Sequence, residues 1–182
     1  AVHFYGKITD VTNFKLQDFS LLPERNIFVD ANVLIYLFWP TGQHFFESNY
    51  AQVFKDLLKQ GNSLYVDFLV ISEVVNRVLR IEHKKLNPNQ NFKNFRNSQD
   101  GKDLISDIYL IVKDEILKHF KIIGKSFNKN DIESFLTLNQ LDFIDKAITS
   151  ICFENNFVLL TNDKDFKNSG LDILTGNPHI LN

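Results

Sequence analysis

Short apolar runs alternate along this chain with longer stretches in which apolar residues recur every three or four positions. The short runs occupy 27–30, 63–66, 120–123 and 157–160, and a fifth begins at 173–174. Helical spacing covers 31–38, 46–58, 70–79, 104–116, 131–138 and 141–155. Strands that are apolar throughout and separated by helices are typical of a parallel sheet covered on both faces. We therefore predict an α/β fold in three layers, with a central parallel sheet of four to five strands flanked by helices.

Two segments depart from this alternation. Residues 1–26 are mixed in character and contain Pro23, and we interpret them as an N-terminal extension that packs on a domain formed by 27–182. Residues 84–102 are polar and rich in asparagine and lysine, which indicates an insertion, either a loop or a frayed helix end. Within the domain, Gly61 is expected to end one helix and Asp67 to begin the next.

Charge and cysteine content limit the classes of function. The formal net charge is −2, so the protein lacks the overall positive field with which non-specific nucleic-acid binders hold RNA or DNA. A local basic rim around an acidic centre is compatible with that charge. The single cysteine, Cys152, excludes an internal disulfide and a cysteine zinc site. No apolar run is long enough for a membrane span and the first residues lack a secretory pattern, so we expect a cytoplasmic protein without a membrane partner.

Acidic residues occur at the positions where an open parallel sheet binds its ligands. Asp30 ends the first apolar run and Asp163 follows the run at 157–160, so both are expected at the carboxyl ends of strands, where such sheets bind ligands. Glu73 lies among apolar neighbours near the start of a helix, and Asp142 and Asp145 are one turn apart at the start of another. Each aspartate alone is more often a cap or turn residue than a ligand. For Glu73 a purely structural role is a weaker explanation, because an unpaired carboxylate in an apolar setting is costly.

Several carboxylates at one rim repel each other, and a hard divalent cation relieves that repulsion. Mg²⁺ and Mn²⁺ prefer oxygen ligands and suit such a ring of acids. The five histidines are scattered along the chain and show no zinc-ligand spacing. The sequence therefore favours one or two Mg²⁺ or Mn²⁺ ions over zinc.

Four short motifs, taken in order, resemble those of PIN domains. They are Val29-Asp30-Ala31-Asn32-Val33-Leu34, Ile71-Ser72-Glu73-Val74, Asp145-Lys146-Ala147-Ile148 and Leu160-Thr161-Asn162-Asp163-Lys164-Asp165-Phe166. The last motif is the most specific, and the resemblance spans roughly residues 27–175. It implies a Rossmann-like sheet and a metal-dependent nuclease that most often acts on RNA. Many small members are toxins of toxin–antitoxin pairs; the N-terminal extension and the 84–102 segment depart from the smallest of these.

The resemblance implies an Mg²⁺- or Mn²⁺-dependent endoribonuclease that hydrolyses RNA phosphodiester bonds. Asp30 and Asp145 are expected as direct metal ligands. Glu73 and Asp163 would complete the acidic ring, directly or through bound water. These four residues are the catalytic set that the sequence predicts.

A second set of polar residues is expected around these acids. Asn32 and Thr161 would hydrogen-bond to the carboxylates and orient them. Asp142 either joins the acidic ring or caps its helix. Asp165 follows Asp163 by two residues, and we interpret it as a cap or turn residue.

The residues that could contact a substrate each have two possible roles. Lys84, Lys85, Lys93 and Arg96 fall in the polar segment, where they could hold phosphates or simply face solvent. Trp39 follows the first helix of the domain and could stack on an RNA base or pack in the core.

Competing functions differ in the acids that they need. A haloacid-dehalogenase phosphatase has a second Asp two residues after its nucleophile, and this chain has Asn32 there. A response-regulator receiver needs paired acids at its first strand, which are absent. The remaining alternative is a non-catalytic PIN-like module that binds RNA or protein, and loss of the acids would mark it. The phenylalanine-rich segment 45–58 could form a surface for a homodimer or an antitoxin.

Overall fold

The computed structural model describes residues 11–182, which contain one six-stranded sheet in the order β1-β6-β5-β2-β3-β4. Its strands are β1 (Asn13–Lys15), β2 (Ile27–Val29), β3 (Leu64–Asp67), β4 (Lys121–Ile123), β5 (Val158–Leu160) and β6 (Ile173–Thr175). Every neighbouring pair is parallel. The predicted α/β fold with a central parallel sheet is confirmed. The sheet has one strand more than the five expected, because β1 comes from the N-terminal segment and pairs with β6.

Helices connect the strands in close agreement with the apolar spacing. They are α1 (Ala31–Phe38), α2 (His44–Gln60), α3 (Phe68–Leu86), α4 (Phe92–Asn97), α5 (Gln99–Ile111), α6 (Leu117–His119), α7 (Lys129–Phe135), α8 (Phe143–Asn155) and α9 (Pro178–Leu181). The π-helical turn η2 (Val112–Ile116) joins α5 to α6, and η1 (Leu16–Leu21) and η3 (Lys164–Asn168) are 3₁₀ helices. Gly61 ends α2 with a φ of 86°, in the left-handed region that favours glycine. Asp67 begins α3 by accepting a hydrogen bond from Val70 N at 2.8 Å.

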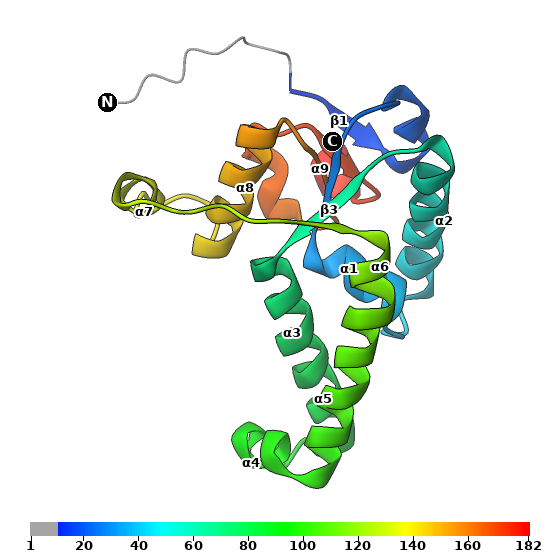
Figure 1. The fold of residues 1–182 in the computed structure, drawn as a ribbon, viewed down its shortest axis with the longest axis vertical. Helices are drawn as coiled ribbons and strands as arrows, with labels where there is room; N and C mark the ends of the chain where they lie inside the picture. Colours follow the sequence, from blue (N-terminus) through cyan, green and yellow to red (C-terminus); the bar gives the residue numbers. More distant parts are fainter. Residues whose placement is uncertain (1–10) are drawn as a thin grey trace.

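The strand order decides which face of the sheet each helix covers. From β2 through β3 to β4 the chain moves one way across the sheet, and from β4 through β5 to β6 it moves the other way. Because crossovers between parallel strands are right-handed, the helices of the two runs lie on opposite faces. Figure 1 shows α2 and α8 on opposite sides of the sheet. The two runs meet where β2 lies beside β5, and open sheets bind ligands at such a reversal.

The core follows the middle of the sheet. Every residue of β2, β5 and β6 is buried, as expected for strands with both faces covered, whereas the edge strand β4 is largely exposed. Helix α2 contributes Tyr50, Val53 and Leu57 to the same core. The strand ends are therefore held in place by the most buried part of the molecule.

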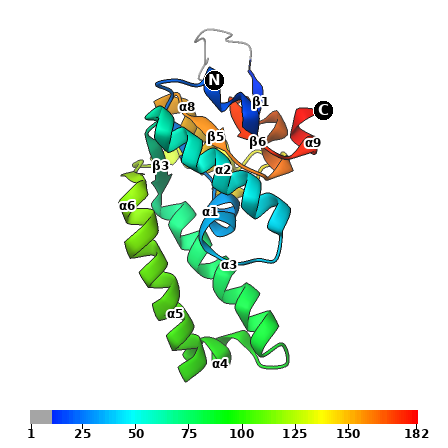
Figure 2. The same cartoon turned by 90° about the vertical axis from the view of Figure 1, so that its right-hand side faces the viewer.

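The polar segment 84–102 contains more helix than expected: it includes the end of α3, all of α4 and the start of α5, and residues 87–91 form a loop. Helix α3 continues to Leu86, α4 fills 92–97 and α5 begins at Gln99. Figures 1 and 2 show α3 and α5 side by side in an arm that projects from the sheet, with α4 at its tip. Phe95 of α4 is buried and belongs to the hydrophobic core of the domain, which anchors this polar segment. Within residues 11–182 no helix is both long and apolar enough to cross a bilayer.

The described part of the N-terminal extension packs on the domain through β1 and η1. Asn62, buried after α2, donates from Nδ2 to the carbonyls of Leu22 at 2.7 Å and Arg25 at 2.9 Å. These bonds fix the chain just before it enters β2. Residues 1–10 of the predicted extension lie outside the described residues.

We expect Gly101→Ala to destabilise the helical arm. A Cβ at Gly101 would lie 2.1 Å from the carbonyl oxygen of Phe95 and 2.9 Å from the backbone of Arg96. Alanine favours a helix over glycine by about 1 kcal/mol. Because backbone atoms block the new methyl group, overpacking outweighs that gain, and we expect a net loss of about 1–3 kcal/mol in the free energy of unfolding, measured by urea denaturation.

Gly124→Ala is the matched control, because a Cβ there meets nothing within 4 Å. Its free energy of unfolding should stay unchanged or rise by up to about 1 kcal/mol. Equal stability of the two variants would contradict the close approach of α4 and α5.

Candidate active site at the ends of β2 and β5

Asp30 directly follows β2 and begins α1, with its side chain only 5% exposed. Its Oδ1 accepts a hydrogen bond from Ala31 N at 2.7 Å. Its Oδ2 accepts one from Asn32 Nδ2 at 2.6 Å and one from Thr161 Oγ1 at 2.7 Å. The carboxylate is thus buried and oriented by three donors from two adjacent strand ends.

Strand pairing brings Thr161 to Asp30. Val29 of β2 pairs with Leu160 of β5, and Asp30 N donates to Leu160 O at 3.1 Å. Thr161, which follows Leu160, therefore lies beside Asp30. Thr161 is fully buried, and its Oγ1 also accepts from Asp163 N at 2.9 Å. Asn32 Oδ1 accepts from Asn162 N at 3.1 Å. The hydrogen bonds that the sequence predicted for Asn32 and Thr161 are therefore present.

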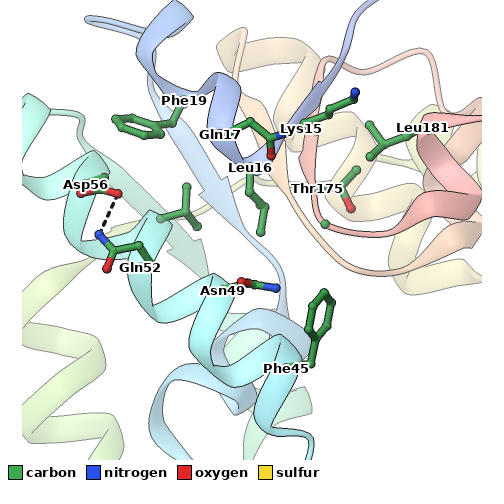
Figure 3. Close-up of a pocket in the computed structure, with 12 residues that line it drawn as sticks. Lys15, Leu16, Gln17, Phe19, Phe45, Asn49, Gln52, Asp56, Thr175 and Leu181 are labelled. Atoms are coloured by element: carbon green, nitrogen blue, oxygen red, sulfur yellow. Dashed lines mark hydrogen bonds between the residues drawn. The ribbon is translucent and has the colours of Figure 1, made fainter.

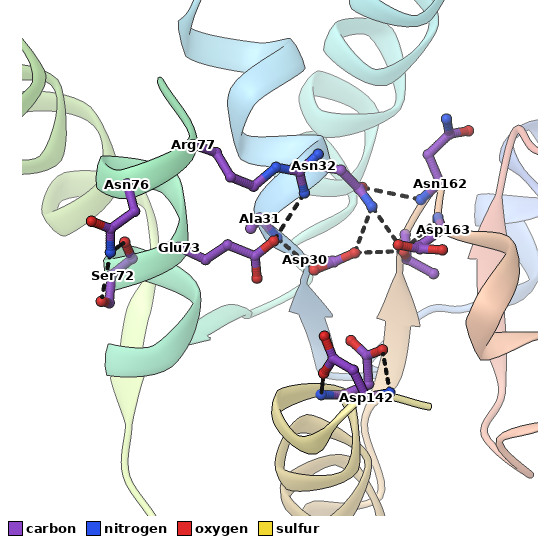
Figure 4. Close-up of polar contacts among 12 residues, drawn as sticks. Asp30, Ala31, Asn32, Ser72, Glu73, Asn76, Arg77, Asp142, Asn162 and Asp163 are labelled. Carbon is purple, nitrogen blue, oxygen red and sulfur yellow. Dashed lines mark hydrogen bonds and ion pairs between the residues drawn. The ribbon is translucent and has the colours of Figure 1, made fainter. Parts of the chain in front are cut away.

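Three further acids surround Asp30, and together these four residues are called the acidic cluster. Asp163 begins η3, Glu73 lies in the second turn of α3, and Asp145 lies in the first turn of α8. Helix α8 connects β4 to β5 on the face of the sheet opposite to α2 (Figure 1). Its N-terminus therefore lies near the carboxyl ends of the strands, where Asp30 is. Figure 4 shows Asp30 between Glu73 and Asp163, with Asp142 facing them from the start of α8.

The electrostatics confirm that these acids share one environment. Burial raises the pKa of Asp30 to about 7; the hydrogen bond from Thr161 opposes this shift, and the negative charges of Glu73 and Asp163 add to it. Burial also raises the pKa of Asp145 to about 6, with further contributions from the charges of Asp142, Asp163 and Glu73. Asp30 and Asp145 thus share two negatively charged neighbours, Glu73 and Asp163.

The outer acids have protein partners in this structure. Glu73 Oε1 pairs with Arg77 Nη1 at 2.9 Å. Asp142 and Asp145 form a capping box, in which Asp145 N donates to Asp142 Oδ1 at 2.8 Å and Asp142 N donates to Asp145 Oδ2 at 3.1 Å. Asp142 therefore serves as the helix cap, one of its two predicted roles. Asp165 is exposed, and its backbone N donates to Asp163 Oδ1 at 3.0 Å.

No group of three or more His, Cys, Asp and Glu side chains within residues 11–182 is already arranged as a set of metal ligands. The chemistry of the acidic cluster nonetheless fits a hard divalent cation, because its donors are carboxylate oxygens, and burial together with neighbouring negative charge raises the pKa of Asp30 and of Asp145. For such an ion to bind, Glu73 would turn from Arg77 and Asp145 from its cap.

Tyr50 of α2 is a residue of this site that the sequence did not single out. Its hydroxyl accepts from Gly176 N at 3.0 Å and lies 3.1 Å from Thr161 O and 3.0 Å from Asn162 Oδ1. Burial raises its pKa to about 12, so the hydroxyl keeps its proton and can donate. A tyrosine within an apolar helical stripe was the available signal, because its hydroxyl needs a buried partner.

The predicted substrate residues are not brought to the acidic cluster. Lys84 and Lys85 lie in the last turn of α3, about 16 Å along the helix from Glu73, and Arg96 lies on α4 at the tip of the arm. The indole nitrogen of Trp39 donates to Glu82 Oε1 at 3.0 Å, so the ring is held between α1 and α3. A role for these residues in RNA binding stays a prediction.

A surface hollow of about 410 Å³ lies elsewhere, between η1, α2 and the end of β6. Figure 3 shows Lys15, Phe45 and Thr175 on its walls, and Gln52 hydrogen-bonded to Asp56. None of the acids of the cluster lines it. The acidic cluster therefore lies at the ends of the strands and outside this hollow.

Comparison with known proteins gives a family and a fold. The chain resembles the crystal structure of PAE2754 from Pyrobaculum aerophilum, with a TM-score of 0.50 and 14% identity over 87% of this chain and 88% of that one. It also matches VapBC2 from Rickettsia felis bound to a DNA fragment from their promoter, with a TM-score of 0.47 and 16% identity over 83% of this chain and 98% of that one. No curated protein sequence matches significantly. The PIN domain family model matches residues 27–170, most of the chain and all four predicted motifs, so the chain belongs to the PIN domain family.

Proposed function

We propose that this protein is an endoribonuclease that hydrolyses RNA phosphodiester bonds with Mg²⁺ or Mn²⁺. PIN domains are generally nucleases, which supports the class of reaction. The observation that carries the proposal is the acidic cluster itself. Asp30, Glu73, Asp145 and Asp163 come from four separate elements, and burial and mutual repulsion raise the pKa of Asp30 to about 7. Such an arrangement is typical of a functional site.

The side chains divide into ligands and supports. Asp30 and Asp145 are the proposed direct ligands, and Glu73 and Asp163 complete the ring. Bound Mg²⁺ or Mn²⁺ would supply a more acidic water and neutralise charge on the phosphate oxygens. Thr161 and Asn32 hold the Asp30 carboxylate in one orientation by donating to Oδ2. They would thereby keep a ligand oxygen fixed while substrate enters and product leaves.

A non-catalytic binding module would explain the same fold but not the acids. A helix can begin with Ser or Thr as well as with Asp, at no electrostatic cost. The buried Asp30, next to two further acids that raise its pKa, makes the metal-free protein less stable. Retaining all four acids therefore favours the enzyme.

The biological setting is a finer hypothesis. A role as the toxin of a toxin–antitoxin pair, with an antitoxin or a second copy of the chain as partner, rests on the sequence resemblance. So does the expected cytoplasmic location. Purification of the chain together with the product of the adjacent gene would test the partner.

We expect Asp163→Asn to abolish most RNA cleavage without unfolding the protein. Asparagine keeps the bond from Asp165 N to the side-chain oxygen at the start of η3, so the local fold is preserved. It removes one negative charge from the acidic cluster. We expect kcat on single-stranded RNA to fall at least about 100-fold, more than for loss of a supporting residue, in assays with Mg²⁺, Mn²⁺ or EDTA.

Asp165→Asn is the matched control, since it makes the same change two residues away on an exposed side chain. Its kcat should equal that of the wild type. Cleavage that persists in EDTA, or wild-type activity of Asp163→Asn, would refute the proposed function.

Divalent ions should stabilise the protein most at neutral and alkaline pH. The folded pKa values of Asp30 and Asp145, about 7 and about 6, lie above the ordinary value of 3.8. Between these values the folded state binds more protons than the unfolded state, so metal-free stability should fall as pH rises from about 4 to about 7. Mn²⁺ at about 100 times its Kd should add about 2.7 kcal/mol, which raises Tm by about 5–10 °C at pH 8.

At pH 5 protons compete for the same carboxylates, and the Mn²⁺-dependent rise in Tm should largely disappear. Asp163→Asn should reduce the rise at pH 8, whereas Asp165→Asn should not. A rise of equal size at both pH values, or none in the wild type, would contradict a metal site in the acidic cluster.

A further inference from the structure

Arg77 is the basic side chain that the structure joins to the acidic cluster. Its Nη1 lies 2.9 Å from Glu73 Oε1, one turn away on α3. Among the ion pairs of residues 11–182, this is the one that involves an acid of the cluster. Figure 4 shows Arg77 on the same side of α3 as Glu73, reaching toward the start of α1. The guanidinium therefore stands at the rim of the cluster.

Helix stability does not account for this placement. An exposed pair four residues apart stabilises a helix only slightly, and salt screens it further. The same pair occupies a carboxylate that the proposed metal site needs. A fixed cation beside that site also repels a divalent ion. Arg77 thus opposes metal binding in the RNA-free protein, which suggests that it serves the substrate.

The side chain suits an RNA phosphate in charge, shape and access. Guanidinium donors form a planar fork that matches two phosphate oxygens. The Arg77 side chain is 47% exposed, so a polymer can reach it. The protein carries a net charge of −2, which makes a local cation more important for an anionic substrate.

We propose that Arg77 binds an RNA phosphate beside the cleaved bond and, until metal and RNA arrive, holds Glu73 as its counter-ion. The inference rests on the proposed function and names the residue that receives the substrate. With a metal ion bound, Glu73 would be one of the residues that hold it, and the guanidinium of Arg77 would be free to bind the phosphate. Removing Arg77 therefore has two effects of opposite sign, tighter metal binding and weaker RNA binding.

The test compares Arg77→Ala and Arg77→Lys with the wild-type full chain. Electron paramagnetic resonance titration of the RNA-free protein gives the Kd for Mn²⁺, which should become about 2–5-fold tighter in Arg77→Ala. Steady-state cleavage of single-stranded RNA gives KM, which should rise about 10-fold or more. Arg77→Lys keeps the charge but loses the fork, so both values should lie between those of the wild type and Arg77→Ala.

Arg80→Ala is the matched control on the same helix. The Arg80 guanidinium lies 4.3 Å from the centre of the Phe92 ring, in the contact of α3 with α4, and makes no ion pair with the cluster. This variant should keep the wild-type Kd for Mn²⁺ and the wild-type KM. Thermal unfolding of each variant establishes that the compared proteins are folded.

A wild-type Kd for Mn²⁺ or a wild-type KM in Arg77→Ala would overturn the inference. A purely structural ion pair would lower Tm and move neither value. The two proposals fail in different ways. Absence of metal-dependent cleavage by the wild type rejects the proposed function, whereas wild-type cleavage with an unchanged KM in Arg77→Ala rejects the role of Arg77 alone.

Discussion

The burial of one carboxylate at the junction of β2 and β5 is the constraint on which this site depends. Asp30 accepts three hydrogen bonds, and those from Thr161 and Ala31 lower its pKa, yet desolvation and the neighbouring acids still raise it to about 7. The donors therefore orient the carboxylate without fully stabilising its charge. A metal ion would supply the missing positive charge, so the feature that weakens the empty protein is the one that would bind the ion.

The surroundings of Asp30 divide into a rigid part and an exchangeable part. Thr161 and Asn162 are held by strand pairing and by the Tyr50 hydroxyl, which ties them to α2 and to Gly176 N. The partners of Glu73 and Asp145 are instead a half-exposed arginine and the capping box at the start of α8. On the proposed function, the orientation of Asp30 would be fixed, whereas Glu73 and Asp145 would leave their present partners to reach a metal ion.

Local patterns were sufficient to predict the central strands, the helices and the acids at their ends. They failed where long-range pairing or packing decides the structure. Asn13-Phe14-Lys15 has one apolar residue and becomes β1 only by pairing with β6 at the other end of the chain. Helix α4 looked like a loop, because its stability depends on buried Phe95 and on the small Gly101. Arg77 follows Glu73 by four residues, but this spacing is also that of an ordinary surface ion pair on a helix, so the spacing alone does not mark Arg77 as part of a site.

The charges of the acidic cluster and of Arg77 affect the order in which a divalent ion and an RNA phosphate would bind at the proposed site. The carboxyl groups of the acidic cluster outnumber the one arginine that pairs with them, and an RNA phosphate would bring further negative charge. On the proposed function, phosphate would therefore bind unfavourably until a divalent ion is present, and the ion would bind better when Glu73 is free of Arg77. A phosphate that attracts Arg77 would free Glu73, so metal and substrate would favour each other's binding, as reciprocal coupling between two sites requires. The acid and the arginine share one helical turn, so one side-chain exchange can serve both ligands.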